Sequence, residues 1–303
     1  DRVLSSLTVM HLLGLRLSEL GNTLSGLGKP RSARVAYRAA SIVAPQWSAP
    51  WFNLALCAKR EGRFQECRNF GRRAADLDPN DPPTWWNLGI AATALGDWPT
   101  AREAWSRYGI AVPDGTGPIE MALGAVPIRL APRTSGEVVW CRRLDPARAI
   151  IVNVPMPESG RGFGDLLLHD GEPRGTRILD GVETPVFDEL ELLAPSDLHT
   201  FTASVSAPRR ADLQELETRA DEARIPFEDW TSSIRFLCKC CSEGSPGQHE
   251  HHHEAQDEWK NLRSVAMAAR TAECAQALLS DWSHAGTGRR ADALVCALRR
   301  PPS

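Results

Sequence analysis

The stretch that decides the fold runs from Trp51 to Pro79, WFNLALCAKREGRFQECRNFGRRAADLDP, and returns in altered form from Trp85 to Pro113, WWNLGIAATALGDWPTAREAWSRYGIAVP. Pro45, Pro79 and Pro113 follow one another at intervals of 34 residues. Three glycines keep the same phase, namely Gly28, Gly62 and Gly96. A fixed period of this length predicts a repeat architecture, in which one helix pair cannot bury its own apolar face and therefore stacks on the next pair.

Residue size inside each period supports the same interpretation. Small residues recur where two helices of one unit must approach closely, at Gly21, Ala33, Gly89 and Ala101. Large aromatic residues recur where the gaps between helices must be filled, at Tyr37, Trp51, Trp85 and Trp105. The glycines are expected to end one helix and allow the turn, and each proline to follow the second helix.

Together these landmarks resemble the tetratricopeptide repeat (TPR) family over residues 14–113, about a third of the chain. The resemblance implies an all-α array of three helix–turn–helix repeats. Residues 1–13 are expected to add a capping helix, because Val3, Leu7, Met10 and Leu13 fall at helical spacing. Four positions depart from the family pattern, namely Leu17, Cys67, Gly71 and Tyr108.

In this family the first helix of each repeat lines a concave groove. The resemblance assigns to that groove Phe52, Asn53, Leu56, Lys59, Arg60, Trp86, Asn87 and Ile90. Asn53 and Asn87 match positions that contact peptides in family members, but Phe52 stands where a carboxylate clamp would need a lysine. We therefore expect a protein or peptide partner with an apolar segment. The alternative is that the chain's own acidic C-terminal region covers Phe52 and Trp86.

The composition of the whole chain limits the number of domains and the classes of partner. The chain has 303 residues, of which 42% are apolar and 24% charged, as in an ordinary soluble globular protein of two or three domains. Residues 14–113 carry 13 Lys+Arg and 8 Asp+Glu, a balance of +5, whereas residues 114–303 carry 21 and 29, a balance of −8. This asymmetry predicts docking of the acidic region on the array or an acidic partner, and favours neither nucleic acid nor membrane. Eight scattered cysteines indicate a reducing, cytoplasmic compartment.

Beyond residue 113 no family is recognised, and the pattern predicts an α+β region. Residues 114–123 are interpreted as a linker after the TPR array, 1–113. Short alternating runs over 124–195 predict a small antiparallel β module. Residues 196–303 alternate strand and helix twice, which predicts a ferredoxin-like βαββαβ domain with an insertion at 236–259.

The insertion contains a Cys/His cluster. Three of the eight cysteines and four of the eight histidines fall between Cys238 and His253. A C-x-x-C turn with returning imidazoles suits tetrahedral Zn²⁺, with Cys238, Cys241, His251 and His253 as ligands and Cys240 or His249 as substitutes. A flexible polar loop is the alternative.

The predicted function is a protein-interaction scaffold with a zinc-stapled C-terminal domain and no assigned catalytic residue. Two alternatives remain open: a zinc-dependent enzyme whose array recruits its substrate, and a metal-handling protein. Two further motifs carry less weight. Gly160–Gly164 is interpreted as a hairpin, and Asp165 with His169 as polar residues at a hairpin end.

Overall fold

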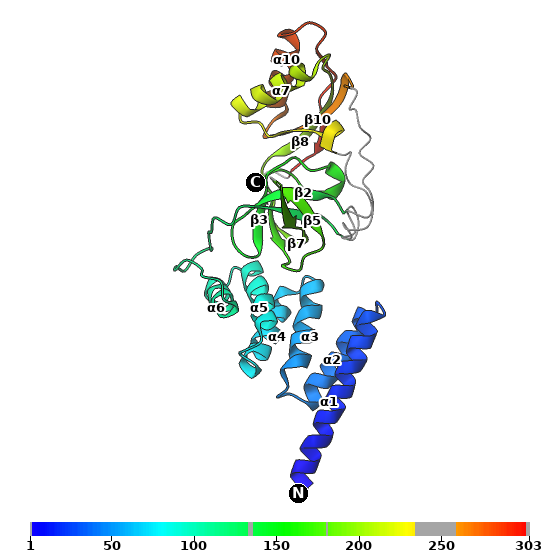
Figure 1. Ribbon diagram of the computed structural model, residues 1–303, viewed down its shortest axis with the longest axis vertical. Coiled ribbons are helices and arrows are strands. Elements are labelled where there is room, and N and C mark those ends of the chain that lie inside the picture. The colour runs from blue at the N-terminus through cyan, green and yellow to red at the C-terminus, as the bar shows by residue number, and fades with distance from the viewer. Residues whose placement is uncertain (1, 133–135, 180, 234–258, 301–303) are drawn as a thin grey trace. The chain divides into compact units, whose positions relative to one another are not determined.

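The computed structural model describes residues 2–132, 136–179, 181–233 and 259–300 (Figure 1). It divides into two compact units, one of Asp1–Met121 with Asp145–Ala147 and one of Ala122–Leu144 with Arg148–Ser303.

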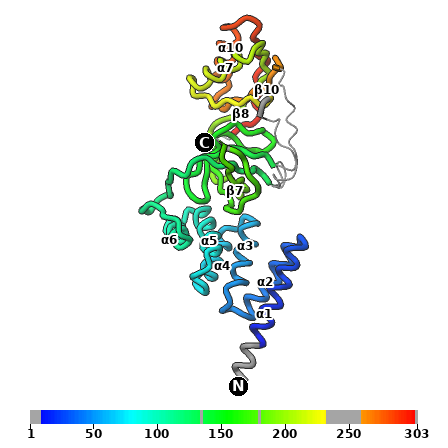
Figure 2. Tube along the Cα trace, viewed as in Figure 1, coloured from blue at the N-terminus to red at the C-terminus, as the bar shows by residue number. Residues whose placement is uncertain are grey.

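The first unit is an array of six helices that follow one another along the chain (Figure 2). They pack as three consecutive pairs, and each pair also contacts the next. In order they are α1 (Arg2–Gly26), α2 (Pro30–Val43), α3 (Ser48–Arg60), α4 (Phe64–Leu77), α5 (Pro82–Ala94) and α6 (Trp98–Tyr108). The expected helical TPR-like array is therefore confirmed.

One hydrogen bond recurs with the 34-residue period. The indole nitrogen of Trp51 donates to the carbonyl of Pro45 at 3.1 Å, and that of Trp85 donates to Pro79 at 2.8 Å. Each tryptophan thus ties a new repeat to the turn that precedes it. The small residues allow close packing, because a Cβ added at Gly89 would lie 2.7 Å from the Trp105 ring.

The prediction of a separate capping helix was wrong. Residues 2–13 continue without a break into the first repeat helix, so that α1 spans Arg2–Gly26. The one glycine at the expected junction, Gly14, does not end the helix. A Cβ there would lie 2.7 Å from the Ala44 side chain, so glycine serves close packing against the end of α2.

The second unit begins with a closed five-stranded barrel. Its strands are β1 (Ala125–Arg129), β2 (Val138–Arg143), β3 (Arg148–Ile151), β4 (Leu166–His169) and β7 (Phe187–Ala194). Alternate residues such as Ile128, Val139 and Leu167 fill the core. A short 3₁₀ helix, η1 (Pro157–Ser159), precedes β4, and a two-stranded sheet of β5 (Thr176–Leu179) and β6 (Val182–Pro185) precedes β7.

The barrel differs from the antiparallel prediction at one seam. Four of its neighbouring strand pairs are antiparallel, but β1 and β7 pair in parallel, Ile128 with Phe187 and Arg129 with Asp188. The cause is parity: five strands that alternate in direction leave the first and last pointing the same way, so closure requires one parallel pair. Arg129 donates to the Asp188 carboxylate at 2.7 Å across this seam.

The rest of the second unit is an antiparallel sheet with two long helices. Its strands lie in the order β11, β8, β10, β9, and β12 also pairs with β8. The core between sheet and helices includes Val205, Met267, Leu216 and Trp282. The elements are β8 (His199–Ser206), α7 (Arg210–Glu222), β9 (Phe227–Asp229), α8 (Trp230–Ser233), β10 (Leu262–Ala269), α10 (Ala272–His284), β11 (Arg290–Ala291) and β12 (Val295–Leu298).

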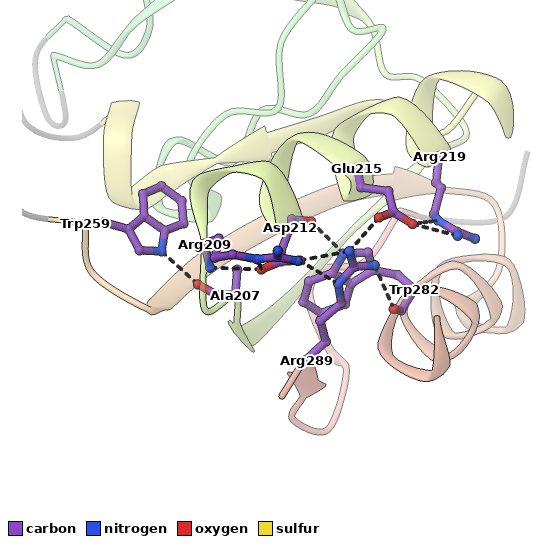
Figure 3. Close-up of polar contacts among 8 residues, drawn as sticks. All are labelled: Ala207, Arg209, Asp212, Glu215, Arg219, Trp259, Trp282 and Arg289. Carbon is purple, nitrogen blue, oxygen red and sulfur yellow. Dashed lines mark hydrogen bonds and ion pairs between the residues drawn. The ribbon is translucent and has the colours of Figure 1, made fainter. Parts of the chain in front are cut away.

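An ion-pair network fixes α7 to the segment after α10 (Figure 3). Arg289 donates to Asp212 at 2.9 Å and to Glu215 at 2.5 Å, and the Trp282 indole donates to the Asp212 carbonyl at 2.7 Å. Hydrogen bonds from Arg209 first, and then from Arg289, hold the pKa of Asp212 below its usual range. Those from Arg289 and Arg219 lower the pKa of Glu215 to about 2.

A second buried pair ties the end of the chain to the barrel. The Arg300 guanidinium pairs with the fully buried Asp165 carboxylate, and the Arg300 backbone N–H donates to His199 Nδ1 at 2.8 Å. Asp165 also accepts from the backbone N–H of Gly162 at 2.9 Å and of Ser196 at 2.8 Å. These contacts identify Asp165 as a structural anchor of the Gly160–Gly164 loop.

Candidate peptide-binding face of the helical array

The predicted groove residues lie on α3 and α5, the first helices of the second and third repeats. The two helices contact each other, so the predicted residues of successive repeats lie on neighbouring helices. The burial of each side chain follows its position within the 34-residue period. Leu54 and Leu88 occupy equivalent positions 34 residues apart and are both almost fully buried. Their neighbours at 52, 53 and 86 are only half-buried.

On α3 the accessible side chains combine apolar and polar character. Phe52, Asn53 and Leu56 are half-buried, and Arg60 is exposed at the end of the helix. Lys59 is 5% exposed. Burial raises the pKa of the Cys57 thiol on the same helix, and this effect outweighs the nearby Arg60 charge, which lowers the pKa. Cys57 therefore remains protonated at neutral pH.

On α5 one side chain of the predicted set remains accessible. Trp86 is half-buried, and its ring centre lies 5.1 Å from that of Trp105 and 4.7 Å from that of Tyr108. Ile90 is fully buried and Asn87 is 6% exposed. The Asn87 amide nitrogen donates to the Pro83 carbonyl at 3.0 Å, and its amide oxygen has no hydrogen-bond partner among the described residues.

Three apolar side chains of the predicted set remain half-buried, namely Phe52 and Leu56, one turn apart on α3, and Trp86 on α5; these three residues are here called the apolar strip. Asn53 on α3 is also half-buried, and Arg60 is exposed. Aromatic side chains on a rigid helix lose little conformational entropy on binding and commonly dominate binding energies. Such a strip can bind the apolar side chains of a peptide. Arg60 can add one charge-assisted contact.

Sequence reasoning missed how Trp86 is held in position. Its ring packs against those of Trp105 and Tyr108, both from α6. The signal was present in the sequence, because Tyr108 is one of the positions that departs from the family pattern. A large aromatic residue there fills space beside the neighbouring first helix.

The predicted zinc ligands Cys238, Cys241, His251 and His253 lie outside the described residues. Within the described ranges, no group of three or more His, Cys, Asp or Glu side chains could hold a metal ion.

The second unit has a polar cavity of about 560 Å³ beside α7. Trp259 lies there, and the guanidinium carbons of Arg210 and Arg263 are 5.3 and 4.8 Å from the centre of its ring. Arg263 pairs with the buried Asp229. These contacts give Trp259, Arg210 and Arg263 a structural role that links α7 to the sheet, so the α3/α5 face is the stronger candidate. The lining also carries Glu217, Asp221 and Glu228, and burial raises the pKa of Glu217 and Glu228.

Comparison with known proteins agrees with this description of the array. Residues 48–81 match the family model described as tetratricopeptide repeat. The chain thus contains a TPR, which confirms the resemblance at its second repeat. No curated protein matches the chain significantly.

Among solved structures, the second TPR of Spaghetti (RPAP3), bound to an HSP90 peptide, is 18% identical with a TM-score of 0.31. The match covers 32% of this chain and 91% of that one. The Sgt2 TPR domain from Aspergillus fumigatus is 23% identical with a TM-score of 0.30, and the match covers 31% of this chain and 63% of that one. Separately, none of the described helices is long and apolar enough to span a membrane.

Proposed function

We propose that this chain is a protein-interaction scaffold whose TPR array binds an apolar segment of a protein or peptide along α3 and α5. The observation that carries the proposal is the strip of half-buried apolar side chains, Phe52, Leu56 and Trp86, on two adjoining first helices. The second unit supplies a separate surface joined to the array. A reducing, cytoplasmic setting is part of the proposal, supported by five described cysteines that are all free thiols.

The test is loss of partner capture by Phe52→Ala/Trp86→Ala in affinity capture from the native cell extract. Truncation of central interface aromatics typically costs more than about 2 kcal/mol each, so capture should fall below detection. Because Trp86 also packs on α6, thermal melting must show that the variant stays folded. Leu95→Ala, an exposed position at the end of α5, is the matched control and should capture normally.

Undiminished capture by the double variant would contradict the proposed site. No capture by the wild-type chain would instead favour the competing arrangement, in which the acidic C-terminal region occupies this face.

We also propose that residues 196–303 form a ferredoxin-like domain. Support comes from the chain order β8, α7, β9, β10, α10 and β12 and from the antiparallel pairing of β8 with β10 and β12. In chain order the insertion at 236–259 falls between the two βαβ halves.

Zinc binding by Cys238, Cys241, His251 and His253 completes the proposal. Two thiolates and two imidazoles match the ligand preference of structural zinc, and metal binding can order a loop that has little apolar content. Elemental analysis of the purified chain should give about one zinc per molecule. Cys238→Ser/Cys241→Ser should lose it, while Cys274→Ser/Cys296→Ser, at two exposed cysteines elsewhere, should keep it. Equal zinc in both variants, or none in the wild type, would refute the site.

A further inference from the structure

The outer face of α2 exposes two large apolar side chains. Val35 is 68% exposed and Ile42 is 69% exposed. They are seven residues apart, which is about 10 Å along a helix and on the same side of it. Beside them a hollow of about 520 Å³ opens between α2 and α4, with Leu54 and Phe70 in its lining.

The repeat itself shows that the fold does not require these residues. The positions 34 residues later, on α4, carry Asn69 and Asp76 in place of Val35 and Ile42. Polar residues are thus compatible with the same position on the outer face of the next repeat. Val35 and Ile42 contribute little to folding where they stand, because about two thirds of each side chain remains in water.

The charges around the hollow indicate what kind of molecule fits there. Helix α2 carries Arg31, Arg34 and Arg38 and no acidic residue. Arg34 pairs with Glu61 at 3.0 Å, and Glu66, the carboxylate in the lining of the hollow, pairs with Arg63. Arg38 lies 5.8 Å from the centre of the Phe70 ring, at the hollow, and forms no ion pair with any described residue. A ligand with carboxylates beside its apolar groups would therefore meet an arginine that is available to it.

We propose that this hollow is a second docking groove, which binds an acidic amphipathic helix of a partner protein. A helix lying along a groove inserts apolar side chains at i and i+7, the spacing that Val35 and Ile42 also have. The groove is lined by α2, α3 and α4 and uses none of the Phe52–Trp86 strip, so it extends the scaffold to a second, independent partner surface.

Two other occupants fit the same residues less well. An anionic membrane would meet a basic apolar helix, but a recess of about 520 Å³ matches inserted side chains better than a lipid surface does. A second copy of the chain, with its α2 antiparallel to this one, would bring the two Arg38 side chains together. Like charges across an interface oppose association.

The test uses the full chain and two synthetic helical peptides that carry leucines at i and i+7. One peptide has glutamates flanking the leucines, and the other has lysines at the same places. Fluorescence anisotropy should show binding of the glutamate peptide, at least about tenfold weaker binding of the lysine peptide, and weakening with salt.

The groove variant is Val35→Asn/Ile42→Asp, which introduces the residues that the next repeat has. It should bind the glutamate peptide at least about tenfold more weakly than the wild type. Ile178→Asn/Val182→Asp is the matched control, at positions that are 72% and 65% exposed in the other unit, and it should bind normally. The loss caused by Val35→Asn/Ile42→Asp should be the same in the wild-type background and in a Phe52→Ala/Trp86→Ala background, which separates this groove from the α3/α5 face.

Three results would overturn the proposal. The first is no peptide binding by the wild type, or equal binding by the groove variant. The second is co-sedimentation of the wild type with anionic phosphatidylserine vesicles that the groove variant loses, which would assign the surface to a membrane. The third is self-association in sedimentation equilibrium that the groove variant abolishes, which would assign it to a second copy.

Discussion

The stabilising contacts within the helical array join residues that are close in sequence, whereas those within the second unit join residues that are far apart in sequence. In the array the indole of Trp85 bonds a carbonyl six residues away, and Trp51 makes the equivalent bond one repeat earlier. In the second unit Arg300 pairs with Asp165 across 135 residues, and the Trp230 indole donates to Val154 across 76. The array is therefore expected to lose stability repeat by repeat, whereas the second unit should unfold as a whole.

The largest change in stability is expected from Trp105→Ala in the array. Trp105 is fully buried, packs on Gly89 and supports Trp86, so its removal should cost about 3–5 kcal/mol of unfolding free energy. We expect amide hydrogen exchange to accelerate in α5 and α6, with α1 and α2 less affected and the second unit unchanged.

Trp98→Ala, at the half-buried start of α6, controls for the loss of a tryptophan and should have a smaller effect. Uniformly faster exchange in both units would show that the two unfold as one.

A smaller effect is expected from Arg300→Met. The change leaves the buried Asp165 carboxylate with its two backbone donors, Gly162 and Ser196, but without a cation. Loss of one partner from a buried pair costs several kcal/mol, and we expect about 3 kcal/mol here because those donors remain. Denaturant unfolding followed by circular dichroism should show the second unit's transition moved and the array's unmoved.

Arg299→Met changes the adjacent exposed arginine and should have almost no effect. Adding Asp165→Asn to Arg300→Met should recover part of the loss. If Arg299→Met is equally damaging, the effect belongs to net charge and not to the pair.

The smallest expected effect is a dependence of the second unit's stability on pH. Burial is the main cause that raises the pKa of Glu137 to about 7, and the carboxylates of Glu158 and Glu228 add to it. This value lies above the usual glutamate pKa of about 4.3, so the folded unit holds the proton more tightly than the unfolded chain between those two pH values. Stability of the second unit should therefore fall as pH rises from about 4 to 7.

Glu137→Gln should remove this dependence and stabilise the second unit by about 1–2 kcal/mol at pH 8 relative to the wild type. Unfolding free energies at pH 5 and pH 8 measure it directly. The same pH dependence in both proteins would exclude Glu137 as its source.

Sequence alone predicted the array because its determinants are local and repeated. Trp51 and Trp85 mark the same bond in two repeats, and Gly89 marks one close approach. Alternation also located strands in the second unit, for example 126–130 where β1 spans Ala125–Arg129. Closure of the barrel had no local signal, since Arg129 and Asp188 are 59 residues apart.

The proposed binding face could be only partly predicted by the same reasoning. Family position indicated the helix faces that carry Phe52 and Trp86, but not that Lys59, Asn87 and Ile90 are buried, since burial depends on neighbours from other elements. The α2 groove was missed although its signal is in the sequence. Comparing Val35 and Ile42 with Asn69 and Asp76 reveals it, once the repeats are aligned position by position.

The parallel seam of the barrel has a consequence for synthesis on the ribosome. Every helix of the array finds its neighbours within about two repeats of chain, so the array can fold as it emerges. Strand β1 cannot close against β7 until 59 more residues have been made, and β8 pairs with β10 across 56 to 70 residues and with β12 across 93 to 98. The nascent chain therefore carries a folded array while strands of the second unit still expose unpaired edges. Slower translation would lengthen that interval and raise the exposure of those edges to aggregation.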